Sequence, residues 1–367
     1  MRYRREDGCR AWLTYGMLEP EMVQDLIQSY GSAETVYDRF RETQGGCLKN
    51  QISEQSLNFL RQQAEPTAMH EMMLTMQRLE IGIMSIEDDL YPEALRQIQS
   101  PPTFLFYRGD PSVLLERSLT IVGTRRATAQ GMQAAFDIAR DLSASGVVIV
   151  SGLASGIDTA GHEGCLAGGS PTVGVCAGGI DLDYPATNHE LREKIVSSGG
   201  LLLSEFPLGS PALAWHFDVR NRILAGLSRG VLMIEARIKS GTMLTVRHAL
   251  DQGREVFAWP GVLGSECAEA AHVLLREGAR FFTNAADVLE DFGWDRVKQT
   301  TKEEKATLPP LNDDQKRIVK ALGMGEQSMD QLAQATGLET ASLSTALTML
   351  QIMGIIQSLP GKVYKII

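Results

Sequence analysis

The segment Gly123-Thr124-Arg125-Arg126 has a composition suited to binding an anion. It comes directly after the apolar run LTIV and before a helical pattern. Backbone N–H groups at such a turn, with a helix dipole behind them, attract an anion, and the two arginines add charged donors. The segment lacks the spacing G-x-G-x-x-G, which disfavours a dinucleotide. The structural alternative is that both arginines are solvated residues of a first helical turn.

A second segment, SGLASGID at residues 151–158, follows the apolar run VVIV. Its glycines and serines, beginning with Ser151 and Gly152, let a backbone approach closely, and the hydroxyls can donate to phosphate. Apart from His162, one helical turn beyond Asp158, no histidine stands where a nucleophilic serine would need its base. A catalytic triad is therefore disfavoured. Asp158 is expected to cap a helix or to accept a hydrogen bond from a local amide.

The segment WHFDVRNR, residues 215–222, combines aromatic side chains that can stack on bases with arginines that can bind phosphates. Arg220 and Arg222 flank Asn221, so on an irregular turn both arginines would reach one face. This pattern predicts a groove for single-stranded nucleic acid, with Phe217 as a stacking residue. The alternative is the start of a surface helix with Phe217 buried.

The segment Lys239-Ser240-Gly241-Thr242 opens another helical pattern and is similar to the end of a phosphate loop. It lacks the first glycine of G-x-x-x-x-G-K-[ST], so ATP hydrolysis is not supported. A fixed phosphate or sugar contact is the functional interpretation. A solvated lysine at an ordinary helix start is the structural one.

Two carboxylates, Glu205 and Glu235, each follow an apolar run. Such a pair could act as acid and base or hold magnesium, but we expect these residues to cap loop amides or to pair with a nearby arginine. The histidines show no metal-ligand spacing. We therefore expect no catalytic residue, no metal and no cofactor.

These segments follow six short apolar runs, and that regularity predicts the fold. The runs lie at residues 119–122, 147–150, 172–175, 201–203, 231–234 and 256–259. Apolar runs without alternation are typical of strands buried on both faces, and the helical patterns between them predict βαβ units with a parallel sheet. Ligands of open α/β sheets bind at the carboxyl ends of the strands. We therefore expect Arg125, Arg222 and Lys239 to share one rim.

Further modules are expected on both sides of this sheet domain, which we place at residues 71–295. Residues 1–70 predict a helical module, and residues 296–310 are a charged, proline-containing linker. Residues 311–367 carry three helical patterns and a Pro-Gly hairpin, the plan of a winged helix, with Ser328 as one helix start. Its presumed recognition helix at 339–353 has no lysine or arginine, so we interpret the tail as a protein-interaction module rather than a DNA reader.

Composition limits the partners of the chain. The net charge of −10 over 367 residues argues against a protein that coats polyanions, so any nucleic acid must be held by local positive features. The apolar runs are too short to span a membrane. The five cysteines lack C-x-x-C spacing and are interpreted as reduced thiols of a cytoplasmic protein.

Taken together, the motifs IVGTRRATAQG, SGLASGIDTAGH, GGIDLDYPATN, LLSEFPLG, FDVRNRILAGLS, IEARIKSGTMLTVRHAL and GREVFAWPG resemble the DNA-processing protein A family (DprA/Smf) over about residues 80–293. The resemblance implies an extended Rossmann-like fold that binds single-stranded DNA without catalysis and forms a homodimer. It also implies loading of the RecA recombinase during natural transformation, with single-strand DNA-binding protein as a further partner. Carried over by position, the DNA pocket falls on Gly123, Thr124, Arg125, Ser151, Gly152, Phe217, Arg220, Asn221, Arg222, Lys239, Ser240, Gly241 and Thr242.

The chain departs from the family pattern at several positions. Ser155 stands where the family usually has the arginine of SGLARGID, and Asp218 stands where proline is usual. The alternative function is that of a nucleotide-processing enzyme, similar to a phosphoribohydrolase, using Glu205 or Glu235 on the same sheet. The P-G-G-x-G-T stretch of such enzymes is missing from the sequence.

Overall fold

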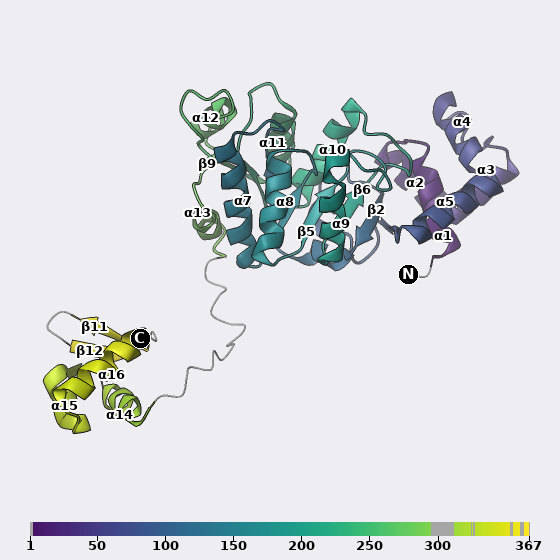
Figure 1. The fold of residues 1–367 in the computed structure, drawn as a ribbon. Helices are drawn as coiled ribbons and strands as arrows, with labels where there is room; N and C mark the ends of the chain where they lie inside the picture. The colour runs from purple at the N-terminus through teal and green to yellow at the C-terminus, as the bar shows by residue number, and fades with distance from the viewer. Residues whose placement is uncertain are drawn as a thin grey trace. The chain divides into compact units, whose positions relative to one another are not determined.

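A nine-stranded, mostly parallel sheet forms the centre of the first of two units into which the chain divides, Met1–Arg296 and Val297–Ile367 (Figure 1). The computed structural model describes residues 3–294, 312–323, 325, 327–352, 355–359 and 363–366. The expected linker at 296–310 lies outside these residues. Within them the sheet has the order β1-β2-β6-β5-β4-β3-β7-β8-β9. The strands are β1 (Gly82–Ser85), β2 (Phe104–Gly109), β3 (Ser118–Val122), β4 (Val148–Ser151), β5 (Thr172–Val175), β6 (Leu201–Ser204), β7 (Gly230–Met233), β8 (Glu255–Ala258) and β9 (Arg280–Phe281).

The six predicted strands are confirmed as β3 to β8, and their neighbours along the sheet pair in parallel. Successive side chains enter different cores, which explains why the apolar runs do not alternate. In β4, Val148 and Val150 belong to the core on one face of the sheet, and Ile149 belongs to the core on the other. The antiparallel strands β1 and β2 extend the sheet beyond β6.

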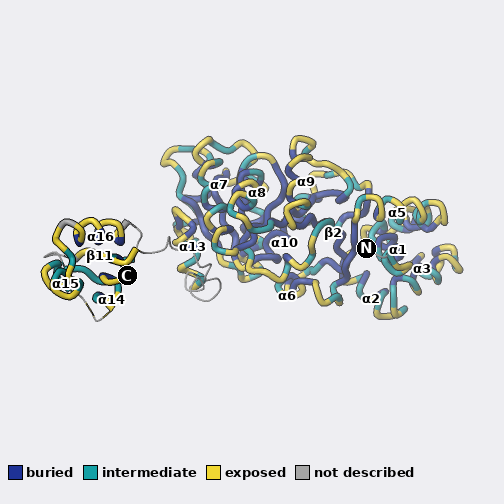
Figure 2. The backbone as a smooth tube through the Cα atoms, turned by 60° about the horizontal axis from the view of Figure 1, so that its bottom comes forward, coloured by how far each residue is buried: buried dark blue, intermediate teal, exposed yellow. Residues whose placement is uncertain are grey.

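Helices cover both faces of the sheet, and the central strands β4 to β7 between them are buried (Figure 2). The chain runs from β3 to β4 on one side and adds β7 on the other side of β3, so the strand order reverses at β3. Open α/β sheets bind ligands at such a reversal, outside the carboxyl ends of the strands. The helices of this part are α6 (Glu93–Arg96), η1 (Pro111–Leu115), α7 (Ala129–Ala144), α8 (Ile157–Gly168), η2 (Ala186–Asn188), α9 (His189–Ser197), α10 (Ala214–Gly226), α11 (Gly241–Asp251), α12 (Glu269–Arg276) and α13 (Ala285–Asp291).

The N-terminal module is helical, as predicted, and its core is continuous with that of the sheet. Buried side chains of the module such as Trp12 and Phe40 belong to the same cluster as Phe106 and Leu202 of the sheet. The expected end of the module at residue 70 lies inside its fifth helix, α5. The module consists of α1 (Arg5–Thr14), α2 (Pro20–Tyr30), α3 (Ala33–Glu42), α4 (Glu54–Gln63) and α5 (Pro66–Arg78).

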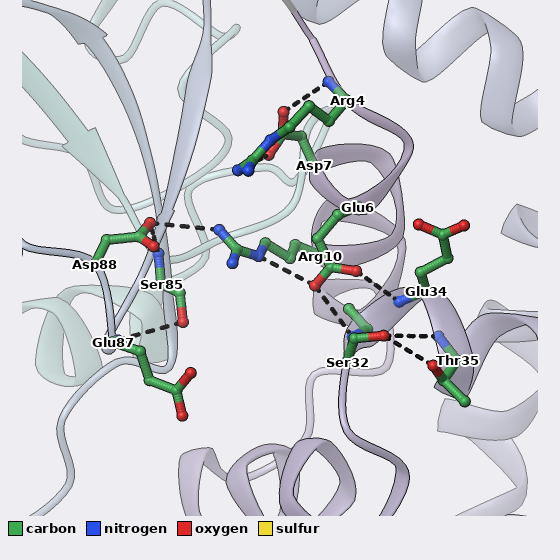
Figure 3. A network of polar contacts seen from close by, with 11 residues as sticks. Arg4, Glu6, Asp7, Arg10, Ser32, Glu34, Thr35, Ser85, Glu87 and Asp88 are labelled. Atoms are coloured by element: carbon green, nitrogen blue, oxygen red, sulfur yellow. Dashed lines mark hydrogen bonds and ion pairs between the residues drawn. The ribbon is translucent and has the colours of Figure 1, made fainter.

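A polar network also joins this module to the edge of the sheet (Figure 3). The Arg10 guanidinium lies 3.3 Å from Glu6 Oε1 and 3.3 Å from Asp88 Oδ2. Asp88 accepts from the backbone N–H of Ser85 in β1, and Glu6 accepts from the first amides of α3, including that of Glu34 at 2.8 Å. Arg10 therefore connects two helices of the module to β1.

The second unit has the winged-helix plan expected for residues 311–367. Its core contains Ile318, Leu332 and Leu347, one from each helix. The predicted helix start at Ser328 is confirmed, since its side chain accepts from the amide of Gln331 at 3.3 Å. The elements are α14 (Asp313–Leu322), β10 (Gln327–Ser328), α15 (Met329–Thr336), α16 (Thr340–Ile352), β11 (Ile356–Leu359) and β12 (Val363–Ile366), with the strand order β10-β12-β11.

In neither unit do the described residues include a helix with the length and apolar character needed to cross a bilayer.

Candidate functional site

A cavity of about 360 Å³ lies where β3 and β7 end, at the reversal of strand order. Its walls come from the loop after β3, the start of α8, one face of α10 and the start of α11. Nine of the thirteen residues expected at the site line it: Gly123, Thr124, Arg125, Phe217, Arg220, Asn221, Ser240, Gly241 and Thr242. We call this the strand-end cavity.

The loop that carries Arg125 is fixed by Glu235, which follows β7. The amide of Thr124 donates to the Glu235 backbone oxygen at 2.7 Å. The amide and hydroxyl of Thr128 donate to the Glu235 carboxylate at 2.9 and 2.7 Å. A Cβ on Gly131 would lie 2.4 Å from the Glu235 carboxyl carbon, so α7 can approach this carboxylate only with glycine there. The expectation that Glu235 caps loop amides is confirmed.

The floor of the cavity is formed by Arg220, which is buried at 4 % exposure. Its Nη1 donates to the carbonyl oxygen of Gly152 at 2.8 Å and to that of Val175. A Cβ on Gly152 would lie 2.7 Å from Arg220 Nη2. Ser151 points into the sheet, where its hydroxyl donates to the Ile121 carbonyl at 2.7 Å. Ser151 and Gly152 therefore support the cavity from behind and do not line it.

Asp158 lies at this floor as well, and its side chain accepts from the Ala154 amide at 3.3 Å. The expected contact with a local amide is thus confirmed. Burial raises the pKa of Asp158 to about 6, against the opposing effect of the Arg220 charge. The charge of the cavity floor therefore depends on pH.

His162 is engaged elsewhere: its Nδ1 lies 2.8 Å from the Thr172 hydroxyl, and burial lowers its pKa to about 3. Deep burial beside a threonine makes this imidazole part of the core beneath α8. It does not act as the base of a serine in residues 151–158.

Phe217 lies at the mouth of the cavity among cationic and aromatic groups. The Arg125 guanidinium is 4.7 Å from its ring centroid, and the guanidinium of Arg220 is 5.9 Å away. Tyr184, 44 % exposed, meets the Phe217 ring edge-on with centroids 5.6 Å apart. A base that stacks on the face of Phe217 covered by Arg125 must first displace that side chain.

The segment 215–222 is not an irregular turn, so the expectation that both of its arginines reach one face is wrong. It forms the first turns of α10, where residues two apart point about 200° apart around the axis. Arg220 therefore faces the strand-end cavity, while Arg222 faces away and donates to Glu205 Oε1 at 2.6 Å. The expected pairing of Glu205 with an arginine is confirmed.

Lys239 is exposed and does not line the cavity. The expected rim of Arg125, Arg222 and Lys239 is therefore not found. Arg126 follows Arg125 in the same loop, where the sequence predicted an anion-binding turn. Its side chain is exposed and lines the cavity with Arg125. Thr245 of α11 also lines it, and sequence reasoning did not select this residue.

The start of α11 supplies groups suited to a phosphate. Ser240 is its N-cap, and the Ser240 hydroxyl oxygen is buried without a hydrogen-bond partner among the described residues. The amides of a first helical turn carry partial positive charge and bind anions. Asn221 Nδ2 donates to the Gly241 carbonyl at 3.3 Å, which fixes α10 against this turn.

No group of three or more His, Cys, Asp and Glu side chains that could hold a metal ion occurs in the part of the chain that the structure describes. The site combines two exposed arginines, a helix start and a buried arginine. Its chemistry is that of an anion-binding surface beside aromatic rings.

The chain is similar to known proteins over much of its length. The family model described as DNA recombination-mediator protein A matches residues 82–293, and the DprA winged helix domain matches residues 302–362. The DNA processing protein DprA of Streptococcus pneumoniae is 41 % identical over 208 residues, which cover 57 % of this chain and 73 % of that protein. Protein Smf of Escherichia coli is 32 % identical over 283 residues, covering 76 % of each.

Two solved structures of DNA processing protein A are similar to the chain. The X-ray structure of the Streptococcus pneumoniae protein has a TM-score of 0.66 at 31 % identity and covers 79 % of this chain and 99 % of that one. The structure of the Helicobacter pylori protein, reported with its single-stranded DNA binding mode, has a TM-score of 0.53 at 30 % identity. It covers 58 % of this chain and 96 % of that one.

Proposed function

Because the chain belongs to the DNA recombination-mediator protein A (DprA/Smf) family, we propose that it binds single-stranded DNA without catalysis and loads RecA onto the strand during DNA uptake. The observation that carries the proposal is the strand-end cavity. Phosphate contacts are available from exposed Arg125 and Arg126 and from the start of α11, where the Ser240 hydroxyl has no partner in the described part of the chain. Phe217 supplies a stacking ring beside them.

Electrostatics limit how tightly such a site holds DNA. With Arg222 paired to Glu205, the exposed cations are Arg125 and Arg126, which line the cavity, and Lys239, which directly precedes the lining residue Ser240. Three phosphate contacts give a log–log salt slope of about −2, since each contact on a single strand contributes roughly −0.7. Stacking and helix-terminus contacts must supply the remaining affinity, because the net charge of −10 repels DNA elsewhere.

The carboxylates that an enzyme would need are engaged in structural contacts. Glu235 holds the loop before α7, and Glu205 is paired with Arg222. A nucleotide-processing activity is therefore disfavoured. Incubation with nucleoside monophosphates tests this directly, since release of free base that Glu235→Gln abolishes would establish an enzyme in place of the proposed binder.

The partners are proposed from family membership. RecA is the recombinase to which the bound strand would be delivered, and single-strand DNA-binding protein is the competitor that must be displaced. A homodimer would present two cavities to one strand and raise the avidity through effective concentration.

The proposal is tested with a labelled oligo-dT and a duplex of equal length. We expect micromolar or tighter binding of the single strand and little binding of the duplex. RecA assembly on DNA covered by single-strand DNA-binding protein should accelerate with the native chain and not with Arg125→Glu. Equal affinity for duplex and single strand would contradict the proposal.

A further inference from the structure

A second cavity, of about 350 Å³, lies against the opposite face of α10 from the strand-end cavity. Its walls come from the end of α1, the start of α2, the segment before β2 and the residues after β6. Phe104 and Phe206, which are 5 % and 3 % exposed, lie in its wall together with Trp215, which is 51 % exposed. We call this the α10 outer cavity.

The ion pair between Glu205 and Arg222 forms a polar part of its wall. Each of the two side chains has one atom without a hydrogen bond to the described residues. The pair is closed between Arg222 Nη2 and Glu205 Oε1. Glu205 Oε2 and Arg222 Nη1 are buried and have no hydrogen-bond partner among the described residues. Buried polar atoms are rarely left unpaired, because the loss of water is then uncompensated. Among the described residues, one acceptor and one donor of this pair are therefore left unpaired, and both belong to side chains that line the cavity.

The charges around this cavity exclude an anion. Glu205, Asp218 and Glu19 line it, against Arg222 and a histidine, His248, that lies 3.5 Å from Asp218. A phosphate would meet an excess of carboxylates here. A neutral planar group with neighbouring donor and acceptor atoms fits the polar pair and the aromatic walls.

We propose that the α10 outer cavity takes one unstacked base from a single strand whose phosphates lie along the strand-end cavity. The inference rests on the proposed function. Every nucleobase presents hydrogen-bond donor or acceptor atoms on its edge, and the four common bases each combine both kinds. Glu205 Oε2 and Arg222 Nη1 meet that edge, while Phe206 and Trp215 contact the ring.

The geometry of α10 explains how one strand reaches both cavities. The first turn of the helix, with Ala214 and Trp215 exposed, separates them. Its free amides favour phosphates, so the backbone of the strand crosses the helix start while the base turns into the cavity. Asp218, which stands where the family usually has proline, lies in the wall of the cavity and helps to keep phosphates out.

The test is a double-mutant cycle between DNA and protein. A short oligo-dT is compared with a series in which one abasic residue moves along the strand, on the native chain and on Trp215→Ala. We expect one position at which loss of the base weakens binding at least about fivefold, the low end of base stacking, in the native chain only. Glu205→Gln, which exchanges the free acceptor for a donor, should reduce the effect at that same position.

Phe281→Ala serves as the matched control, because Phe281 is an exposed aromatic residue of β9 at the far end of the sheet. Its abasic profile should equal that of the native chain. If the losses from abasic residues and from Trp215→Ala simply add at every position, the base site is refuted while DNA binding stands. If the native chain does not bind oligo-dT, the proposed function fails and this inference fails with it.

Discussion

Replacing Arg125 by glutamine tests the assignment of the strand-end cavity through its salt dependence. The side chain is exposed, and its contact within the described structure is with the face of Phe217 at 4.7 Å. If it binds one phosphate, its loss changes the log–log salt slope by about 0.7. A change of that size corresponds to about fivefold weaker binding of the strand at about 0.1 M salt and to no loss of affinity near 1 M.

Stability should change little, because an exposed cation–π contact contributes only about 0.5–1 kcal/mol. The assay is fluorescence anisotropy of labelled oligo-dT at several salt concentrations, together with a thermal melt. Arg229→Gln is the matched control: it removes the same charge from an exposed arginine directly before β7, at the amino end of that strand. Its salt slope should match that of the native chain.

A local phosphate site at Arg125 is refuted if Arg125→Gln keeps the native slope, or if Arg229→Gln changes the slope as much. The first result would mean that Arg125 binds no phosphate. The second would mean that net charge, and not a local site, governs the binding of the strand.

Other perturbations have expected outcomes of their own. Glu235→Ala should weaken oligo-dT binding and lower the free energy of unfolding by about 1–3 kcal/mol, since Thr128 loses its acceptors, and Glu235→Gln should restore part of both in the same assays. Asp158→Asn should raise affinity severalfold at about pH 7.5 and leave it unchanged near pH 5, because with a pKa of about 6 the native carboxyl is already protonated there. Since this pKa is raised above the unfolded value, the native chain should gain stability as pH falls through about 6 towards 4, and melts of Asp158→Asn should lack that gain. Deleting residues 308–367 should leave oligo-dT affinity unchanged in gel shifts, and loss of binding would show that the tail reads DNA.

The sheet was predictable because each of its central strands is buried on both faces. A residue such as Ile149 faces one core while Val150 faces the other, so both positions must be apolar and the run stands out in the sequence. The strand β9 consists of Arg280 and Phe281, both exposed, so it has no such run that would mark it as a strand.

For residues 215–222 the sequence could not favour the alternative, a helix start, over an irregular turn, because α10 lacks a single apolar stripe. Its buried residues include His216, Arg220 and Asn221 as well as Ile223 and Leu224, so no helical period separates a core face from a solvent face. The contact of Arg222 with Glu205 depends on the packing of α10 against the end of β6, which local sequence does not encode. The nine residues around the cavity could be selected from their motifs. The direction in which the Arg222 side chain points could not be predicted, because it depends on that packing.

The shared core of the helical module and the sheet has a consequence for synthesis on the ribosome. The Tyr15 hydroxyl donates to the Leu208 carbonyl at 3.1 Å, and Leu208 belongs to the same apolar cluster as Trp12. Trp12 of α1 packs on Tyr37 and Phe40, which follow soon in the chain, but Leu208 is translated only roughly 200 residues after α1. That delay is about 10–40 s at about 5–20 residues per second. During that interval the part of the helical module's apolar surface that the sheet later covers stays exposed to solvent.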